Sequence, residues 1–476
     1  MKLQDYAPFA ASLVLVGVTA CGGATAKTST DTPVDSGPAP AVTDSGTTVV
    51  VADTGVADAA PDVDHGSVST TYPAFTPDIG QITNNGGPVL AKPEIVTVTW
   101  PGDTNAATYE AFGDGLGKSQ YWATSVTEYG VGVATSGPAN HVRMTTPLAA
   151  TMSDMDIANY VAQQATAPAE SVDAGADGGT DAAPAAAAWP APTANTIYTL
   201  YIPATTSVQL QGADACQQGV GGYHDNVMAG SLNVAYAVVL ECSEFAGPGG
   251  LVQEVTQSAS HEIVEGSTDP SPNVDPAWIG FDDDKHIAWD IFQQFQDEIG
   301  DACELYQNSF YTDTESAFNF GVQRMWSNKS GAAGHDPCVP VASGPYYNVT
   351  LLDPEDITVD ASMFGMSSKF PSKGIRILSG QTKTFAIGFY SDAATTPWNI
   401  TAYEGNPLFG PMGTTSNLEI TLDVNKGQNG NKAYLTVKVK SQGSMNAELI
   451  AIASSQSTGQ FAEYTANYMP ILIGSQ

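Results

Sequence analysis

Three residues in the middle of the chain could do metal chemistry: His261, Glu262 and Glu265, which form the motif His-Glu-x-x-Glu. On a helix, His261 and Glu265 are i and i+4 neighbours, so an imidazole and a carboxylate project from one face about 6 Å apart. This is the spacing of two zinc ligands, and Glu262 lies beside them, where the general base of a metallohydrolase lies. The motif therefore predicts a metal site that binds Zn²⁺ or another divalent metal.

The residues around the motif have the periodicity of a helix. Apolar residues recur at three- and four-residue steps and form one stripe, which consists of Val252, Val255, Ala259 and Ile263. His261 and Glu265 fall roughly opposite this stripe, so the back of the helix is predicted to pack into a core while these two side chains face a cleft or solvent. Asp269-Pro270 ends the helix, because proline cannot continue the hydrogen-bond ladder. The alternative is an amphipathic surface helix whose polar face is solvated.

The chain begins with a short apolar stretch at residues 6–20, followed by Cys21. Such a stretch is too short to span a membrane and is typical of a secretory signal. The small residues before Cys21 resemble the bacterial lipoprotein processing signal, in which that cysteine is acylated; the alternative is an ordinary secretory signal cut nearby. We therefore expect residues 1–21 to be a lipoprotein signal peptide. The mature protein would be lipid-anchored at the bacterial cell envelope, in the outer membrane or at the cell surface, or would otherwise be secreted.

Two segments have the composition of flexible linkers. Residues 22–75 contain mainly Asp, Thr, Ala, Val, Pro, Gly and Ser, and are predicted to form a disordered acidic tether. A second such segment, at about residues 167–188, is predicted to be a disordered loop inserted into the folded region, because strand-like sequence flanks it. The formal net charge of −34 argues against nucleic acid as a partner. We expect the lipid to be the only membrane contact and the chain to be a monomer.

Four cysteines remain after Cys21, which is an even number for a chain in an oxidising compartment. They are Cys216, Cys242, Cys303 and Cys338, and three connectivities are possible. The pairs Cys216–Cys242 and Cys303–Cys338 are favoured because each closes a local loop that flanks the motif helix. A four-cysteine metal site is disfavoured because the Cys-x(2–4)-Cys spacing is absent.

The predicted fold class is α+β, with a zincin-like α/β domain followed by an all-β sandwich. In the first domain, residues 76–345, strand patterns occur at residues 94–100, 196–202 and 235–240, and helical patterns at residues 109–122 and 155–164. In the second, residues 346–476, short strands are separated by Gly, Asn, Ser and Pro; they lie at residues 384–390, 398–403, 418–424, 434–440 and 448–453. No binding chemistry is evident in the second domain.

Several stretches, taken in order, resemble the plant phosphate-induced (EXORDIUM-type) secreted proteins and their bacterial relatives. They are residues 99–100, residues 121–122 with 125–129, residues 198–202, Cys216 with residues 222–224, residues 236–242, the motif with Thr268 and Pro270, residues 298–304, residues 322–328 and Cys338. The resemblance covers roughly residues 85–340. It implies an extracellular location and a zincin-like helix, and it implies no particular reaction.

A zinc site needs three protein ligands with one position open to water, and the motif supplies only two. The resemblance implies that the third comes from downstream of the helix, with Asp301 as the first choice and Glu298 as the second. Either could instead cap a turn or accept backbone N–H groups. His224 is a further candidate, as an extra ligand, a substrate contact or a hydrogen-bonded structural residue. The remaining histidines are predicted to be surface residues; they are His65, His141, His286 and His335.

The favoured function is a lipid-anchored, extracytoplasmic, zincin-like metallohydrolase that acts on peptide bonds, with Glu262 as the general base. With His261, Glu265 and Asp301 as ligands, the ligand charge sums to −2, which weakens the Lewis acidity of zinc and argues against vigorous peptidase activity. The alternative is a non-enzymatic envelope protein of EXORDIUM type that binds a cell-surface ligand or signals. A glycosidase would need paired carboxylates, and no such pairing is recognisable.

Overall fold

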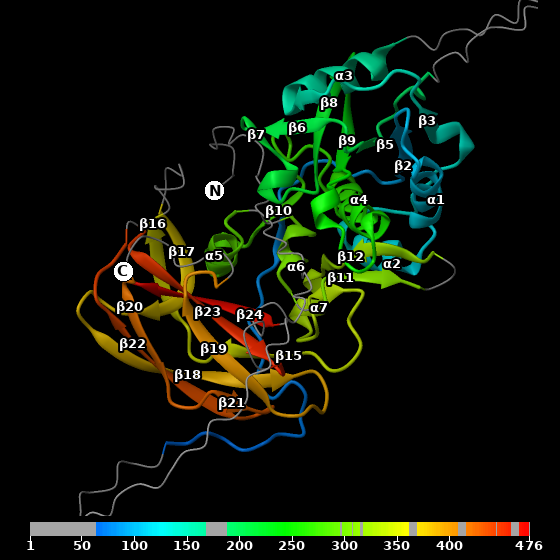
Figure 1. The fold of residues 1–476 in the computed structure, drawn as a ribbon. Helices are drawn as coiled ribbons and strands as arrows, with labels where there is room; N and C mark the ends of the chain where they lie inside the picture. The colour runs from blue at the N-terminus through cyan, green and yellow to red at the C-terminus, as the bar shows by residue number, and fades with distance from the viewer. Residues whose placement is uncertain are drawn as a thin grey trace, which may run out of the picture.

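The computed structural model describes residues 63–167, 188–295, 298–306, 308–314, 318–360, 369–407, 416–443, 445–457 and 466–475. The predicted signal peptide with Cys21, the tether up to residue 62 and almost all of the predicted loop insertion lie outside the described residues. The protein is a mixed α+β structure with several sheets, followed by a C-terminal region that is mostly β (Figure 1). The α+β class and the β character of the C-terminal region agree with the sequence prediction.

The first region is built on a five-stranded sheet with the order β3-β2-β5-β9-β8. Its strands are β2 (Glu94–Thr99), β3 (His141–Arg143), β5 (Thr196–Ile202), β8 (Gly222–Ala229) and β9 (Leu232–Leu240). Strands β3, β2, β5 and β9 pair in parallel, and β8 pairs antiparallel with β9. Every residue of β5 is buried, which is expected of a central parallel strand with both faces covered.

Helices cover both faces of this sheet (Figure 1). Helices α1 (Ala106–Leu116), α2 (Gln120–Val126) and α4 (Leu251–Thr268) share a hydrophobic core with one face, and α3 (Asp154–Thr166) shares a core with the other. The helical pattern predicted over residues 109–122 forms two helices. The second starts after Ser119, whose hydroxyl accepts a hydrogen bond from the Trp122 N–H and so caps α2.

Short strands and helices complete the first region. The small sheets are β1 (Ile82–Asn84) with β10 (Trp278–Phe281), β11 (Phe310–Asp313) with β12 (Phe320–Gln323), β13 (Met325–Trp326) with β14 (Cys338–Val339), and β4 (Thr151–Ser153) with β6 (Ser207–Leu210) and β7 (Ala213–Asp214). The remaining helices are α5 (Asp283–Phe292), α6 (Asp301–Glu304) and α7 (Asn328–Ala332).

The C-terminal region consists of two sheets that share one core. The four-stranded sheet is β15 (Tyr347–Leu351), β18 (Thr382–Ser391), β22 (Lys432–Val439) and β20 (Leu418–Leu422). The six-stranded sheet is β16 (Glu355–Asp360), β17 (Lys369–Arg376), β24 (Asn467–Gly474), β23 (Ala447–Ser455), β19 (Trp398–Glu404) and β21 (Lys426–Gly427). Inward-facing residues of both sheets belong to the same hydrophobic cluster, which is the packing of a β-sandwich.

Helix α5 joins the two regions, because it packs on the six-stranded sheet (Figure 1). Its apolar residues form one cluster with side chains of β16, β23 and β24; those of the helix are Ile287, Ala288, Ile291 and Phe292. The side-chain amide of Asn406 donates to the carbonyl of Phe292 at the end of α5 (2.9 Å). The segment that follows α5 in the chain is therefore anchored on the C-terminal region.

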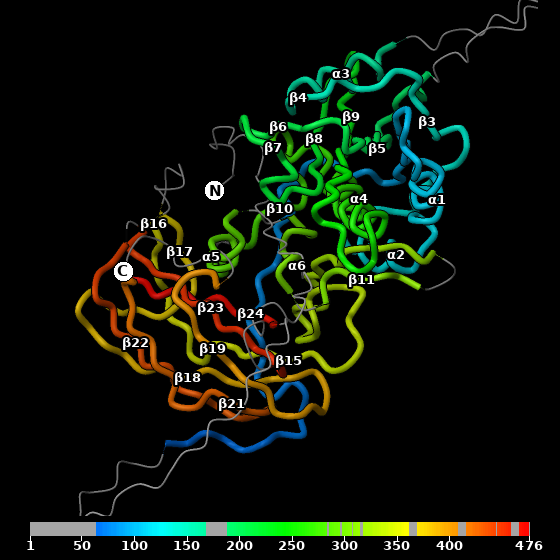
Figure 2. The backbone as a smooth tube through the Cα atoms, viewed as in Figure 1, coloured from blue at the N-terminus to red at the C-terminus, as the bar shows by residue number. Residues whose placement is uncertain are grey.

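Residues 63–75, which the sequence assigned to the disordered tether, lie along the C-terminal region. Figure 2 shows this segment in blue at the edge of that region, from which the chain rises to the first sheet. The backbone N–H of Lys432 donates to the carbonyl of His65 (2.7 Å), and the Asn429 side chain donates to the carbonyl of Thr71 (2.9 Å). The tether prediction was too long at its C-terminal end, because these contacts come from residues more than three hundred positions away.

Candidate metal centre

Helix α4 carries His261, Glu262 and Glu265 in the interior of the protein. All residues from Ala259 to Thr268 are buried, and the helix contacts α1 and α2 as well as β8, β9 and β12. His261, Glu262 and Glu265 are 6%, 5% and 2% exposed. The alternative of a surface helix with a solvated polar face is wrong, and the buried charges need compensation inside the protein.

His261, Glu265 and Asp301 form a first group whose side chains could hold a metal ion. Nε2 of His261 lies 2.9 Å from Oε2 of Glu265 and 3.4 Å from Oδ1 of Asp301, and all three donor atoms lie within 4.8 Å of one another. His261 and Glu265 come from successive turns of α4, and Asp301 comes from the start of α6. The structure thus brings together the two motif residues and the first choice for a third ligand.

The side chain of Gln323, at the end of β12, orients His261. Its Nε2 donates to the carbonyl of Gly300 (2.7 Å), so its Oε1 faces Nδ1 of His261 at 2.9 Å and must accept the N–H there. Nδ1 of His261 therefore carries a proton, and Nε2, which faces Glu265 and Asp301, is the ring nitrogen that a metal would bind. Metal-ligating histidines are held in this way, with the other ring nitrogen donating to a fixed oxygen.

The other oxygen of Glu265 is held by the backbone that carries Asp301. Oε1 accepts hydrogen bonds from the N–H groups of Gly300 (2.8 Å) and Asp301 (3.1 Å). Gly300 is required here, because a Cβ at this position would lie 2.7 Å from Oε1 of Glu265 and 2.9 Å from Nδ1 of His261. These two hydrogen bonds hold the start of α6 against α4. The second oxygen, Oε2 of Glu265, then faces His261 and His224.

His224, Glu265 and Glu298 form a second group that could hold a metal ion. Nδ1 of His224, on β8, lies 3.7 Å from Oε2 of Glu265 and 3.5 Å from Oε2 of Glu262. Its Nε2 lies 3.6 Å from Oε2 of Glu298 and 3.2 Å from the carbonyl of Asp269. The second choice for the third ligand and the extra histidine therefore lie together beside the first group.

The buried charges shift the pKa values of these residues in directions set by their neighbours. Burial lowers the pKa of His261, but the carboxylates of Glu265 and Glu262 outweigh it and raise that pKa well above its usual value. Burial raises the pKa of Glu265, but the charge of His261 outweighs it and lowers that pKa to about 2. Burial and the charge of Glu265 raise the pKa values of Glu298 and Asp301. The buried carboxylates therefore outnumber the positive charges beside them, and a divalent cation would supply the missing positive charge.

A cleft of about 340 Å³ opens onto this centre. Its lining includes the polar side chains of His261, Glu262, Glu304 and Gln323 and the apolar side chains of Leu240, Phe245, Val255 and Phe310. Burial raises the pKa of Glu262, and a Cβ on Gly222 would lie 2.8 Å from its carboxylate, so Gly222 leaves the room that Glu262 occupies. Burial raises the pKa of Glu304 to about 8, so this carboxyl group can also carry a proton at neutral pH.

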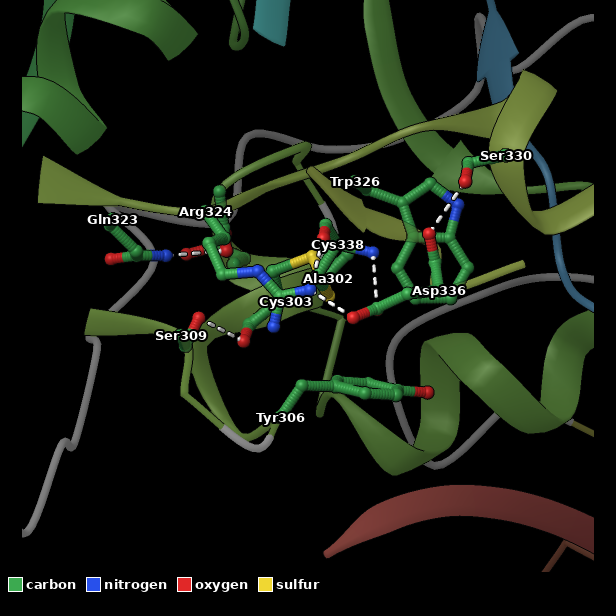
Figure 3. Close-up of a disulfide and its surroundings, with 12 residues drawn as sticks. Ala302, Cys303, Tyr306, Ser309, Gln323, Arg324, Trp326, Ser330, Asp336 and Cys338 are labelled. Atoms are coloured by element: carbon green, nitrogen blue, oxygen red, sulfur yellow. Dashed lines mark hydrogen bonds and ion pairs between the residues drawn. A yellow bond between two sulfur atoms is a disulfide. The ribbon is translucent and has the colours of Figure 1, made fainter. Parts of the chain in front are cut away.

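Two disulfides brace the walls of the site, and they are the pairs favoured from the sequence. Cys216 is bonded to Cys242, and Cys303, in α6, is bonded to Cys338 in β14. Figure 3 shows the second disulfide beside Gln323 and Arg324, whose guanidinium contacts Asp336 and the carbonyl of Cys338. The disulfides indicate an extracytoplasmic location.

The site also contains residues that the sequence analysis missed. Gln323 and Glu304 appeared only within stretches that carried the family resemblance, and neither has a local pattern that predicts its place beside His261.

Outside the site, His286 was predicted to lie on the surface and is buried, with Nδ1 2.6 Å from Asp282 and Nε2 2.9 Å from Asp78. This prediction was wrong because Asp78 comes from a segment 208 positions earlier.

Comparison with known proteins gives a partial match to a solved structure. No protein-family model matches the chain, and no curated protein matches it. A solved structure with a partial match is a conjugative transposon lipoprotein from Bacteroides eggerthii DSM 20697, with 9% sequence identity over 27% of this chain and 95% of that chain. The TM-score of 0.15 is too low to indicate a common fold. In the part of the chain that the structure describes, no helix is both long enough and apolar enough to cross a membrane.

Proposed function

We propose that this protein is an extracytoplasmic, zincin-like metallohydrolase that cleaves peptide bonds. In this proposal His261, Glu265 and Asp301 hold a Zn²⁺ ion, and Glu262 is the general base. The observation that carries the proposal is that His261 and Glu262 line the 340 Å³ cleft, while Glu265 and Asp301 lie 2.9 and 3.4 Å from Nε2 of His261. A metal there would be reached by a substrate from the cleft.

The first group of side chains suits zinc in its donor spacing. Donor atoms of a tetrahedral site with bonds of about 2.0–2.1 Å lie about 3.3 Å apart. The distances from His261 Nε2 to Glu265 and Asp301 are 2.9 and 3.4 Å, which requires only small adjustments. The set supplies three protein donors and leaves a fourth position, as catalytic zinc sites do.

In the proposed reaction the metal, Glu262 and the apolar residues of the cleft have separate roles. Bound zinc supplies a Lewis acid and lowers the pKa of a water molecule. Glu262 accepts the proton of the attacking water and returns it to the leaving amine, and its raised pKa suits a group that must hold a proton between these steps. The apolar residues of the cleft, which include Leu240 and Phe310, would bind substrate side chains and exclude water.

A lipid anchor and the EXORDIUM relationship belong to the same proposal. The small residues before Cys21 support acylation of that cysteine and attachment at the cell envelope, and the two disulfides support an oxidising compartment. The order of the matching stretches supports a distant relationship to the EXORDIUM-type proteins. The proposed substrate is a peptide or a peptide-containing component of the cell surface.

The substitution Glu262→Gln tests the proposal. The amide cannot accept a proton and is not a ligand, so the variant should keep its metal and its melting temperature while peptide hydrolysis falls by about 10²-fold or more. Glu448→Gln is the matched control, since it makes the same change at a buried carboxylate in β23, and it should keep full activity. Equal activity in wild type and Glu262→Gln, or no hydrolysis of a peptide library by the metal-loaded wild type, would favour the non-enzymatic binding protein.

A further inference from the structure

We propose that the centre binds two divalent cations that share the carboxylate of Glu265. The first lies between His261, Glu265 and Asp301, and the second lies between His224, Glu265 and Glu298. This inference rests on the proposed function, because it extends the metal site on which that function depends. With two cations bound, the centre would have the ligand arrangement of a two-metal hydrolase site, in which metal ions supply Lewis acids.

Glu265 has the position of a shared ligand. Both candidate groups contain it, and in each group the three donor atoms lie within 4.8 Å of one another. Its Oε1 is occupied by two backbone N–H groups, whereas Oε2 lies 2.9 Å from Nε2 of His261 and 3.7 Å from Nδ1 of His224. One carboxylate oxygen thus faces a ring nitrogen of each histidine, one from α4 and one from β8.

The two histidines are oriented in the same manner. Nε2 of His224 lies 3.2 Å from the carbonyl oxygen of Asp269, which can only accept, so Nε2 carries the proton. Nδ1 of His224 is then unprotonated in the neutral ring and faces the carboxylates of Glu262 and Glu265. His261 repeats this arrangement with Gln323 as the acceptor. A ring nitrogen aimed at carboxylate oxygens needs either its own proton or a metal cation between them, and a cation bound there would take the place of that proton.

Glu298 adds an independent observation at the second site. The residue is 7% exposed, and its Oε1 makes no hydrogen bond to the residues that the structure describes. Its Oε2 lies 3.6 Å from Nε2 of His224, so the Glu298 side chain must turn toward the Nδ1 side of the ring to share a cation with Glu265. A buried carboxylate oxygen without a donor is costly, and coordination of a cation removes that cost.

The carboxylates of Glu262, Glu265, Glu298 and Asp301, when ionised, match the charge of two divalent ions. Glu262, Glu265, Glu298 and Asp301 are all buried and together carry −4 when ionised. Among the described residues, their ion pairs are with His224 and His261 alone. With both histidines neutral as ligands, one divalent cation leaves −2 and a second brings the sum to zero. Neutrality is the condition under which such a cluster is stable in a low-dielectric interior.

The test measures metal stoichiometry in the purified full-length chain. The metal-free protein is titrated with Zn²⁺ in a calorimeter, and the bound metal is counted by elemental analysis after removal of the excess. We expect two equivalents in the wild type, one in His224→Gln, one in Glu298→Gln and one in Asp301→Asn. The matched control is His141→Gln, because His141 also lies between two acidic side chains, Glu110 and Asp114, but far from the centre in the sequence; it should keep two equivalents.

The outcomes separate this inference from the proposed function. One equivalent in the wild type, lost in Asp301→Asn and unchanged in His224→Gln, would overturn the two-metal site and leave the single-metal hydrolase intact. No bound metal in the wild type would overturn both. If a variant fails to fold, X-ray absorption spectroscopy of the zinc-loaded wild type decides the question: zinc–zinc scattering supports the pair, and its absence at full loading overturns it.

Discussion

Gln323 offers a direct test of how the metal centre is held, because its side chain contacts a proposed ligand without being one. The substitution Gln323→Leu keeps the approximate volume of the side chain. It removes the acceptor for His261 Nδ1–H (2.9 Å) and the donor to the Gly300 carbonyl (2.7 Å). His261 would then be free to rotate or to adopt the other tautomer, in which Nε2 carries the proton and cannot bind a metal.

The expected loss follows from these two contacts. A hydrogen bond contributes about 0.5–1.5 kcal/mol net, and removing a partner from a buried polar group costs about 1–3 kcal/mol. Loss of the group that orients a ligating histidine lowers metal affinity about 10- to 100-fold, which equals about 1.4–2.7 kcal/mol. Because Gln323 is 1% exposed and water cannot readily replace it, we expect the upper half of this range, about 30- to 100-fold.

The assay is a competition titration of Zn²⁺ between the metal-free protein and a chromophoric chelator, with circular dichroism to confirm folding. Gln293→Leu is the matched control. Gln293 is also buried and donates to a carbonyl of the α6 segment, that of Ala302 (3.1 Å). Both variants lose a hydrogen bond to α6, but only Gln323→Leu releases His261. An equal loss of affinity in both variants, or none in Gln323→Leu, would refute the proposed orientation of His261.

Four further predictions follow from the structure and the sequence. Burial opposes protonation of His286, but Asp282 and Asp78 outweigh it and raise its pKa from 6.5 to about 9. This shift contributes about 3 kcal/mol to the free energy of unfolding; the contribution is full below the unfolded pKa and is lost as the pH rises through about 9. Urea unfolding across this range should show the loss in the wild type and not in His286→Gln. Gly300→Ala should lower zinc affinity in the same titration, because the new Cβ displaces Glu265 or His261. Replacing both Cys303 and Cys338 by Ala should lower the free energy of unfolding by about 4 kcal/mol, since the bond closes a loop of 35 residues. Cys21→Ser, outside the described residues, should move the protein from the membrane fraction to the soluble fraction in cell fractionation, and a tightly membrane-bound variant would argue against a lipid anchor.

The parts of the fold that local sequence determines were predictable. The strand at residues 196–202 forms β5 with the same ends, because its β-branched and aromatic residues suit a strand buried on both faces. The motif helix was predicted to end at Asp269-Pro270, and α4 ends at Thr268 with Asp269 as its cap. In both cases the local sequence predicts the element: a continuous run of strand-forming residues in β5, and a proline that stops the helix after α4.

The surroundings of the centre were not predictable in the same way, since they depend on contacts between distant segments. Gln323 reaches His261 from 62 positions away, on a strand whose sequence gives no hint of a partner. The helical wheel placed His261 and Glu265 opposite the apolar stripe, and that geometry predicted a cleft or solvent. It could not predict that β8 and β12 cover this face and enclose Glu265 almost completely. The amphipathic pattern of a helix predicts which of its faces is polar. Whether that face is buried depends on which other elements of the fold pack against it.

The C-terminal region has a part in the site, although it contributes no metal ligand to either group. The segment that runs from the end of α5 into α6 carries Glu298 and Asp301, and it is held at both ends. At its start, α5 packs on the six-stranded sheet; at its end, the Tyr306 hydroxyl donates to the carbonyl of Tyr468 in β24 (3.2 Å) and Cys303 is bonded to Cys338. Metal affinity depends on ligands that are held in place before the ion binds. The β region therefore acts on the candidate metal centre through the backbone that positions Glu298 and Asp301, which is a reason for the two regions to share a continuous core.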